Sequence, residues 1–374
     1  MFIKSIRVEN FRNIKHAELE FSSGVNIFCG DNAQGKTNLL EAIAICLGKS
    51  FRNIRRTDIL PFNMIESNCR IAVNYEIEAI SGKVNEIVYE ADVNSYSVKI
   101  NDIPLKKATD LYGEFKYVVF TPDNLGLVKG EPALRRGYLD NIAIMQNKAH
   151  RKFANEYNSA LKQRCMAYWQ KCSPQMLEIW DDILIKQGIN LTYGRLKYLE
   201  LIREYACEIY QELSGGEKNG ENGEKLDISY ESNVFGFETD FADKTKLYDI
   251  YAQKLQSVDS EGQSSKTHGA HKDDILFSIS GKNARTFASQ GQLRSIVVAL
   301  KLAEAQIIRS FNRENPVVLL DEVLGELDEN RRGFVLKHFD NSQCFITSCN
   351  VQDFEGLTDS RIWSVNDGVF VFRQ

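Results

Sequence analysis

The chain has 374 residues and a formal net charge of −5, and 43% of its residues are hydrophobic and 26% charged. This length exceeds what one hydrophobic core usually serves, so we expect two domains of a globular protein rather than a disordered chain. The mildly acidic balance argues against a wholly basic nucleic-acid binder, but it leaves a local basic face open. No apolar run reaches about 18 residues, so no membrane span is expected. The eight cysteines lack C-x-x-C spacing, and a cytoplasmic protein fits better than a disulfide framework or a zinc site.

The N-terminal third is predicted to be strands around one glycine-rich turn. A helix is expected after that turn, over Lys36–Leu47, because its leucines and isoleucines recur at helical spacing. Residues 70–120 alternate with period two, which predicts an antiparallel sheet in which Asn101-Asp102 closes a hairpin. The individual strands expected here are Phe2–Val8, Glu18–Ser22, Val25–Cys29 and Phe115–Phe120.

The middle of the chain changes to helical periodicity. Helices are expected from Pro132 to Leu213, with a new one starting at Ser173-Pro174, and they look too short and irregular for a long coiled coil. After a polar glycine-rich loop the chain returns to α/β character, with strands at Asp274, Val317 and Phe345. The predicted fold class is α/β: a mixed sheet with a phosphate-loop core, an antiparallel sheet, and a mainly helical second lobe.

The loop from Gly30 to Thr37 fits the pattern G-x-x-x-x-G-K-[ST] between a strand and a helix. Its glycines permit the tight curve, and the loop N–H groups together with the helix N-terminus attract an anion. Lys36 is expected to bridge the β- and γ-phosphates of ATP, and Thr37 is expected to bind Mg²⁺. The predicted nucleotide-binding residues of the loop are Gly30, Asp31, Asn32, Ala33, Gln34, Gly35, Lys36 and Thr37.

The apolar strand from Val317 to Leu320 ends in two carboxylates. Asp321 is positioned to hold the Mg²⁺ water shell, and Glu322 to polarise an attacking water. An ordinary buried strand that ends in acidic residues looks similar, and only the phosphate loop favours the catalytic interpretation. The predicted catalytic residues are therefore Glu322, Lys36 and Asp321, and the predicted metal ligands are Thr37 and Asp321.

The segment Ser289-Gln290-Gly291-Gln292 opens a long amphipathic helix. A serine at this position is usually only a helix cap. If the helix end of one copy faces Lys36 of another copy, however, Ser289 and the N–H groups that follow can bind the γ-phosphate. ATP would then join two identical chains, and its hydrolysis would release them. Ser289, Gly291 and Gln292 are therefore added to the predicted nucleotide-binding residues.

Together, the phosphate loop, Ser289-Gln290-Gly291-Gln292 and Asp321-Glu322 resemble the ABC-type ATPases of the SMC class, and the chain is most similar to the bacterial RecF family. The resemblance runs through nearly the whole chain in order. It is carried by Asn10-Phe11-Arg12-Asn13, Lys36-Thr37-Asn38-Leu39-Leu40-Glu41-Ala42, Gly48-Lys49-Ser50-Phe51-Arg52, Pro122-Asp123-Asn124-Leu125, Arg135-Arg136-Gly137-Tyr138-Leu139-Asp140 and Thr267-His268-Gly269-Ala270-His271-Lys272-Asp273-Asp274.

The resemblance implies an ABC-type ATPase head formed by residues 1–125 and 265–374, with a helical lobe over residues 126–264. It adds Arg12 and Asn38 to the nucleotide-binding residues. It implies a weak, Mg²⁺-dependent ATPase that forms a homodimer on ATP, binds gapped DNA or single-strand/double-strand junctions, and helps to load RecA together with RecR and RecO.

Three features depart from related proteins, and one of them is Ala270 and Lys272, which stand where proline and arginine are common ahead of the signature. Asp31 and Ala33 stand where alanine or asparagine and glycine are more usual in the loop, so its curvature is in question. Cys349 and its neighbours follow the last core strand where transporter ATPases place a switch histidine, which is consistent with slow hydrolysis.

Several basic clusters are candidates for contacts to DNA phosphates. For each cluster a solvated surface of mixed charge is an equal alternative. The pair Arg135-Arg136 has a second alternative, bracing the lobe interface, and Arg52 has another, acting on the nucleotide. No recognition helix or zinc-finger spacing is found, so binding should depend on DNA shape and on salt. The predicted contacts are Arg52, Arg55, Arg56, Lys129, Arg135 and Arg136.

Other ATPases with such a head remain as alternatives. An OLD-type nuclease would need an acidic metal-binding domain after the ATPase, and about fifty residues follow Asp321. A transporter motor subunit would lack the helical lobe and carry a switch histidine. An SMC-like repair ATPase with a different set of partners is the closest alternative.

Overall fold

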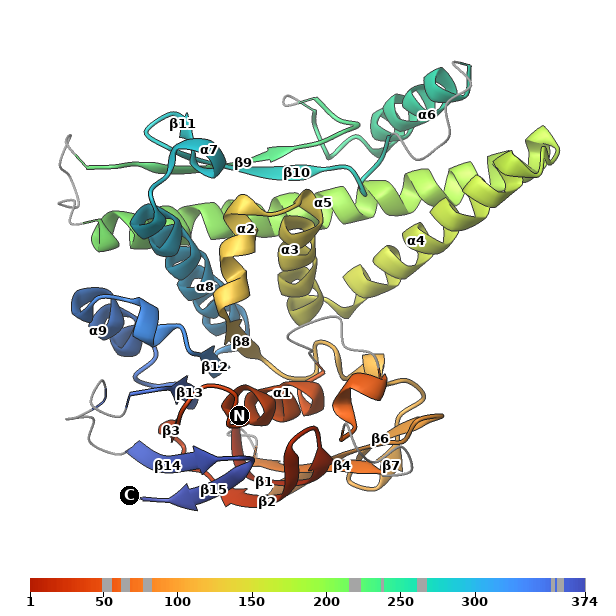
Figure 1. Cartoon of the computed structure of the whole chain (residues 1–374). Helices are drawn as coiled ribbons and strands as arrows, with labels where there is room; N and C mark the ends of the chain where they lie inside the picture. Colours follow the sequence, from red (N-terminus) through yellow and green to blue (C-terminus); the bar gives the residue numbers. More distant parts are fainter. Residues whose placement is uncertain are drawn as a thin grey trace. The chain divides into compact units, whose positions relative to one another are not determined.

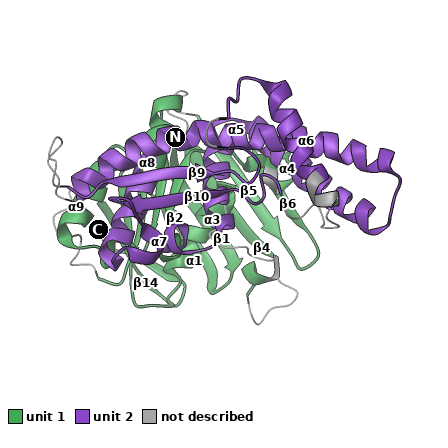
Figure 2. Cartoon of the chain, turned by 90° about the horizontal axis from the view of Figure 1, so that it is seen from above, with its two compact units in different colours: residues 1–124, 304–374 green, residues 125–303 purple. Residues whose placement is uncertain are grey.

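The computed structural model describes residues 1–48, 56–61, 68–76, 83–214, 223–236, 239–260, 268–350, 354 and 360–373. The chain divides into two compact units (Figure 2). Unit 1 comprises Met1–Asn124 and Glu304–Gln374, and unit 2 comprises Leu125–Ala303. The two units are described separately below.

Unit 1 contains two six-stranded sheets among its described residues. The first is antiparallel, with the order β2-β1-β4-β5-β6-β7. Its strands are β1 (Phe2–Phe11), β2 (Ile14–Glu20), β4 (Cys69–Glu76), β5 (Val84–Ala91), β6 (Tyr96–Ile100) and β7 (Ile103–Pro104). Asn101 and Asp102 join β6 to β7 with φ of 50° and 64°, the left-handed pair of a tight hairpin, so the predicted hairpin is confirmed.

The second sheet is mixed, with the order β15-β14-β3-β13-β12-β8. Its strands are β3 (Val25–Cys29), β8 (Tyr117–Phe120), β12 (Val317–Asp321), β13 (Cys344–Ser348), β14 (Ser360–Asn366) and β15 (Val369–Phe372). All neighbouring pairs are parallel except β14 with β15. Parallel pairing brings the C-terminal ends of β3, β12 and β13 to one edge, where Asp321 pairs with Thr347 and Ser348 pairs with Cys29. In parallel α/β sheets this edge is where ligands bind.

Helix α1 (Lys36–Cys46) packs against both sheets of unit 1. It contacts β1, β4 and β5 of the antiparallel sheet and β12 and β13 of the mixed sheet (Figure 1). A helix enclosed on two sides must be apolar around most of its circumference. The sequence meets this requirement with a run of buried residues, Leu39, Leu40, Ala42, Ile43, Ala44 and Cys46. Among the described residues, one other helix longer than one turn lies wholly in unit 1, namely α9 (Glu329–His338).

Unit 2 is mainly helical and also holds a small sheet. Its helices are α2 (Gly126–Lys129), α3 (Pro132–Gln146), α4 (Lys148–Trp169), α5 (Pro174–Leu213), α6 (Lys244–Ser260), α7 (Ala284–Phe287) and the first part of α8 (Gln290–Asn312). The sheet has the order β11-β10-β9, formed by β9 (Leu226–Glu231), β10 (Asp274–Ile279) and β11 (Lys282–Asn283). Within the described chain, no helix is long and apolar enough to cross a membrane.

Because of this sheet, unit 2 extends to Ala303 instead of ending at residue 264 as expected. Residues 265–303 were expected to belong to the ATPase lobe, but β10 pairs antiparallel with β9 along its whole length and so belongs to unit 2. A strand pairing between segments this far apart in sequence is not visible in local periodicity. The chain returns to unit 1 only within α8, at Glu304.

The expectation of short helices is wrong for α5, which is 40 residues long and packs along α4 (Figure 1). It begins at Pro174, as predicted. Its two inner glycines are positions of close packing rather than breaks. A Cβ on Gly188 would meet the ring of Tyr251 at 2.7 Å, and one on Gly194 would meet His150 Nδ1 at 2.6 Å.

A buried ion cluster holds α3, α4 and α5 together. Arg195 on α5 donates to both oxygens of Asp140 on α3 at 2.8 Å, and His150 on α4 bonds the same carboxylate at 2.9 Å. Burial alone would raise the pKa of Asp140, but the hydrogen bonds and charges of Arg195 and His150 outweigh burial and lower this pKa to about 2. The Asp140 carboxylate therefore stabilises unit 2 only while it is ionised.

Three turns of unit 1 meet with almost no space between their backbones. Gly368, in the turn between β14 and β15, has φ +74°, and a Cβ there would lie 2.3 Å from the carbonyl oxygen of Asn13. Its N–H donates to the carbonyl of Gln34 at 2.8 Å, and Asn13 donates to the same carbonyl at 3.2 Å. The side chain of Gln34 accepts from Asp367 N–H at 2.7 Å. The glycine-rich loop that contains Gln34 is thus braced from two sides.

We predict that Gly368→Ala destabilises unit 1 by about 3 kcal/mol, the left-handed backbone contributing about 1 kcal/mol and the clash with Asn13 the rest. Gly281→Ala is the matched control, because Gly281 has φ +78° and nothing within 4 Å of its ideal Cβ. Gly281→Ala should lower the stability only by the cost of the left-handed backbone, about 1 kcal/mol. Thermal unfolding of both variants measures the difference, and equal losses would show that the packing around Gly368 is loose.

We predict that Asp140→Asn removes part of the acid sensitivity of the protein. A carboxylate whose pKa is lowered by folding stabilises the native state above its unfolded pKa of about 4, and this contribution, about 2 kcal/mol, is lost as pH falls towards 2. The variant should be less stable at pH 7 and should show a shallower loss between pH 4 and 2, as measured by urea unfolding. Asp182→Asn, at an exposed pair with Lys186, should change stability by less than about 1 kcal/mol.

Candidate functional site

The glycine-rich loop joins β3 to α1 at the C-terminal edge of the mixed sheet. Gly30 packs so closely that a Cβ would lie 2.3 Å from the carbonyl oxygen of Val365. Gly35 is the N-cap of α1, with φ +107° and no side-chain cap, and the first turn contains no acidic residue. By contrast, α4 and α9 are capped by the side chains of Asn147 and Asp328. Helices α3 and α5 also begin without a side-chain cap, but α1 begins directly after the glycine-rich loop, so its uncapped N–H groups are available to an anion held by this loop.

Ala33 keeps the curvature of the loop despite the missing glycine. Its φ is +64°, in the left-handed region that a glycine adopts without strain. An alanine there costs about 1 kcal/mol, which a braced loop can tolerate. The unusual loop sequence therefore does not change the curvature of the loop. It places one non-glycine residue, Ala33, in a strained backbone conformation.

Lys36 is almost fully buried inside the loop, with 2% of its surface exposed. Its ammonium group donates to the carbonyl oxygens of Gly30 at 2.7 Å and Asp31 at 2.8 Å. It also lies 3.0 Å from a carboxylate oxygen of Glu322. A lysine held this way has its charge already desolvated and surrounded by oxygens, the environment that phosphate oxygens would also provide.

Asp321 ends β12 and is 7% exposed. One of its oxygens accepts from the hydroxyls of Thr37 and Thr347, both at 2.8 Å. Burial raises the pKa of Asp321, and the charge of Glu322 adds to this, while the two hydroxyl bonds and Lys36 oppose it. The sequence predicted Thr37 and Asp321 at this point but not the role of Thr347, whose partner is set by the pairing of β12 with β13.

The oxygens of Thr37 and Asp321 fit Mg²⁺ by their chemistry. A phosphate-loop Mg²⁺ takes only one or two oxygens from the protein and completes its shell with phosphates and water. The described residues contain no cluster of three or more His, Cys, Asp or Glu that could hold a metal ion.

Glu322 follows in a left-handed conformation, with φ +55°. Its N–H donates to the Thr347 hydroxyl at 2.9 Å, and its carboxylate reaches Lys36. Cys349, just after β13, is exposed, and its sulfur lies 3.0 Å from Asn32 Oδ1, 3.5 Å from Lys36 Nζ and 3.8 Å from Glu322 Oε1. The residue at the place of a switch histidine is therefore a thiol in contact with the candidate catalytic groups.

Arg12 and Asn38 form a polar layer beside α1. The Arg12 guanidinium donates to Asn38 Oδ1 at 2.6 Å and to the carbonyl of Asp58 at 3.1 Å, and it pairs with the buried carboxylate of Glu41. Asn38 in turn donates to Asn13 at 2.8 Å. These contacts place both residues at the loop, and their contact with nucleotide stays a prediction.

Ser289, Gly291 and Gln292 lie at the start of α8, in unit 2. The N–H of Ser289 donates to Gln292 Oε1 at 2.7 Å, and the N–H of Gln292 donates to Ser289 Oγ at 3.3 Å. This reciprocal pair is a capping box. The ordinary role of a helix cap is therefore present, and it leaves the hydroxyl hydrogen of Ser289 able to donate to another group.

The predicted DNA contacts divide into three groups. Arg52, Arg55 and the side chain of Arg56 lie outside the described residues. Lys129, at the end of α2, is exposed, and its contact with DNA stays a prediction.

Arg135 requires a correction, because it is 3% exposed and bonds both oxygens of Asp274, at 2.6 and 2.9 Å. This ion pair is internal to unit 2, so we remove Arg135 from the phosphate contacts. Arg136 donates to the carbonyl of Asp273 at 2.8 Å and is partly buried, and its contact with DNA stays a prediction.

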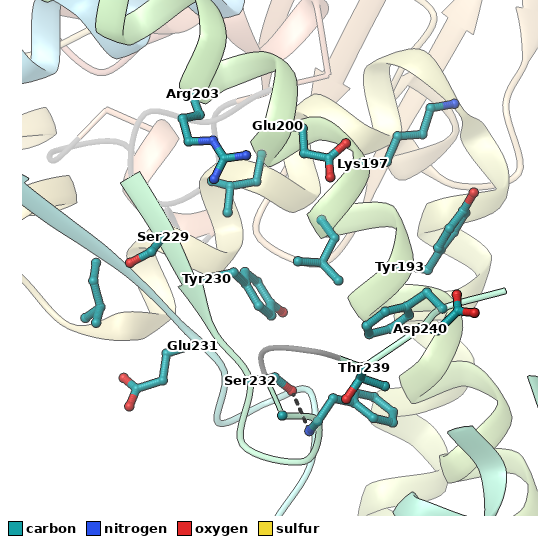
Figure 3. Close-up of a pocket in the computed structure, with 16 residues that line it drawn as sticks. Tyr193, Lys197, Glu200, Arg203, Ser229, Tyr230, Glu231, Ser232, Thr239 and Asp240 are labelled. Atoms are coloured by element: carbon teal, nitrogen blue, oxygen red, sulfur yellow. Dashed lines mark hydrogen bonds between the residues drawn. The ribbon is translucent and has the colours of Figure 1, made fainter. Parts of the chain in front are cut away.

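A cavity of about 670 Å³ lies in unit 2. Figure 3 shows side chains of α5, among them Tyr193 and Arg203, on one side and Ser229 to Ser232 on the other. Its lining holds none of the predicted nucleotide-binding residues. The predicted nucleotide-binding residues of unit 1 lie at the edge of the mixed sheet.

Known proteins resemble this chain over almost its whole length. The family model of the RecF/RecN/SMC N-terminal domain matches residues 2–368. The DNA replication and repair protein RecF of Clostridium acetobutylicum is 33% identical over 374 residues, covering 98% of this chain and 99% of that protein. The protein of the same name from Streptococcus suis is 32% identical, covering 98% of each chain.

Solved structures agree with this. The recombination mediator protein RecF with ATP, in the RecFOR pathway, matches with a TM-score of 0.87 and 30% identity, covering 100% of this chain and 98% of that one. An Smc head bound to the C-terminal winged-helix domain of ScpA matches with a TM-score of 0.58 at 16% identity, and this likeness supports the fold alone. The fold is thus the ABC-type ATPase head with a second lobe, and the predicted resemblance is confirmed. The chain belongs to the RecF/RecN/SMC family, and within it to the RecF DNA replication and repair proteins.

Proposed function

We propose that the protein is an ATP-dependent DNA-binding recombination mediator. ATP would join two copies into a clamp on gapped DNA or on a junction between single and double strands. Together with RecR and RecO, the clamp would promote loading of RecA. The observation that carries the proposal is the group formed by Lys36, Thr37, Asp321 and Glu322, each joined to another by a contact of 3.0 Å or less. The RecF relative solved with ATP supports the choice of nucleotide.

In the proposed site, Lys36 exchanges the carbonyl oxygens of Gly30 and Asp31 for phosphate oxygens, with no new cost of burying its charge. Thr37 and Asp321 would hold Mg²⁺, which would supply charge neutralisation at the phosphates. Glu322 accepts the proton of the attacking water once a phosphate has taken over Lys36, and the bond from its N–H to Thr347 keeps its backbone in place. These residues bind and orient the triphosphate but leave its outer face for another chain.

The second half of the site is proposed to come from a second copy. Ser289 and the N–H groups at the start of α8 would donate to the γ-phosphate held by Lys36 of the partner copy. Without a γ-phosphate the two copies have little to join them, so hydrolysis would open the clamp. An SMC-like repair ATPase with other partners shares this chemistry and differs only in the DNA and proteins that it binds.

We predict that Lys36→Ala raises the dissociation constant for ATP at least about tenfold and abolishes ATP-dependent dimerisation, because the phosphates lose their buried cation. Ser289→Arg should leave ATP binding within about twofold of wild type but block dimerisation, because it acts across the interface. Fluorescent-nucleotide titration and light scattering with and without ATP separate the two effects.

A gapped-duplex titration at several salt concentrations completes this test. Wild type with ATP should bind in a steeply salt-dependent way, and Ser289→Arg should bind weakly. A wild-type protein that remains monomeric with ATP and has no affinity for DNA would overturn the proposed function. Normal dimerisation of Ser289→Arg would overturn only the contribution of the second copy.

We predict that Glu322→Gln lowers the hydrolysis rate by about a hundredfold or more, since a general base typically contributes at least this factor. ATP binding should persist, so the dimer should accumulate and its lifetime should increase. Phosphate release and the decay of light scattering after dilution measure both quantities. If the dimer of this variant dissociated as fast as that of wild type, Glu322 would not be the group that limits hydrolysis.

A further inference from the structure

The segment Ser289–Gln292, called here the signature segment, is held by a residue that precedes it by more than sixty positions. Gln292 Nε2 donates to Glu224 Oε1 at 2.7 Å. The other oxygen of Glu224 accepts from the hydroxyl of Tyr210 at 2.9 Å. Tyr210 is 1% exposed and lies near the end of α5, so Glu224 links the long helix of unit 2 to the start of α8.

The amide of Gln292 can face its neighbours in two ways, and Glu224 decides between them. An ionised carboxylate only accepts hydrogen bonds, so it binds the NH₂ group of the amide and not its oxygen. The oxygen is then left to face the N–H of Ser289, which is the bond observed at 2.7 Å. With the opposite orientation the NH₂ group would meet the N–H of Ser289, donor against donor, and the capping box would open.

We propose that Glu224 is a positioning residue for ATP-driven dimerisation, acting through Gln292 on the backbone and hydroxyl of Ser289. The proposal rests on the proposed function, in which Ser289 meets the γ-phosphate of the partner copy. On this proposal Glu224 stabilises the dimer, whereas its charge alone would destabilise the dimer. A carboxylate near the γ-phosphate would repel it, so on charge alone the removal of Glu224 would tighten the dimer.

Two substitutions separate orientation from charge. Glu224→Gln removes the charge but keeps an acceptor for Gln292, and its NH₂ group can donate to the Tyr210 hydroxyl. Glu224→Lys offers only donors, which turns the Gln292 oxygen away from Ser289. Glu224 is exposed, so neither change introduces a buried charge. Glu231→Lys, an exposed position at the far end of β9, is the control for an equal change of charge in the same unit.

The first measurement is amide hydrogen exchange at Ser289 in the full chain without nucleotide. Losing the acceptor for this N–H should speed its exchange about tenfold in Glu224→Lys, while Glu224→Gln and Glu231→Lys stay within about twofold of wild type. Unchanged exchange in Glu224→Lys would overturn the positioning role. This readout needs no dimer, so it decides the question even if the proposed function fails.

The second measurement is the dissociation constant of the ATP-dependent dimer, with ATP binding to the monomer measured in parallel. Glu224→Lys should weaken the dimer about tenfold, with Glu224→Gln and Glu231→Lys near wild type and ATP binding unchanged in all three. A tighter dimer in both Glu224 variants would show that charge, not orientation, governs this contact. A wild-type chain that does not dimerise would count against the proposed function instead.

Discussion

The carboxylate of Asp321 is the point on which the rest of the site depends. It is nearly buried at the end of β12, and the hydroxyls of Thr37 and Thr347 converge on one of its oxygens. These two hydroxyls come from the phosphate-loop helix and from β13, so one acceptor joins three segments that are far apart in sequence. A buried carboxylate without such bonds would be costly. Even with them its pKa is raised, chiefly by burial, so a cation placed beside it would be strongly stabilised.

The ion pair of Lys36 and Glu322 complements this carboxylate. The lysine is desolvated by the loop, while the glutamate remains about one-third exposed. A phosphate that takes over the lysine therefore displaces the more easily hydrated partner, and Glu322 becomes available to a water molecule. In the proposed reaction, binding of the triphosphate and activation of the general base are thus two results of a single exchange at the Lys36 ammonium.

The parts of the site that the sequence could predict are those whose neighbours are adjacent in the chain. The loop from Gly30 to Thr37 and the pair Asp321-Glu322 each form one short motif, and the fold class followed from them and from periodicity. Partners set by tertiary pairing could not be predicted in this way. Thr347 reaches Asp321 through strand register, and Gly368 reaches the loop through a turn close to the C-terminus.

Two expectations failed for the same reason. Arg135 looked like a surface cation because its partner, Asp274, is 139 positions away. Residues 265–303 looked like part of the ATPase lobe because the pairing of β10 with β9 leaves no local signal. The hairpin signal Asn366-Asp367-Gly368 was in the sequence and could have identified the turn that braces the loop.

Two of the ten described non-glycine residues with a positive φ lie where the proposed chemistry requires fixed groups. Ala33 and Glu322 both have left-handed backbones, each costing about 1 kcal/mol or more for a residue with a Cβ. Each is held by hydrogen bonds at or beside it, since the Glu322 N–H bonds Thr347 and the carbonyl of Gln34 is bound by Gly368. Such bonds prevent the strained residues from relaxing, so loop, lysine and carboxylates are in place within unit 1. A half-site that is already rigid gains little from rearranging itself around a nucleotide. In the proposed function, the free energy of binding ATP is then left for the contact between two copies, which is why we place the switch in dimerisation rather than in the loop.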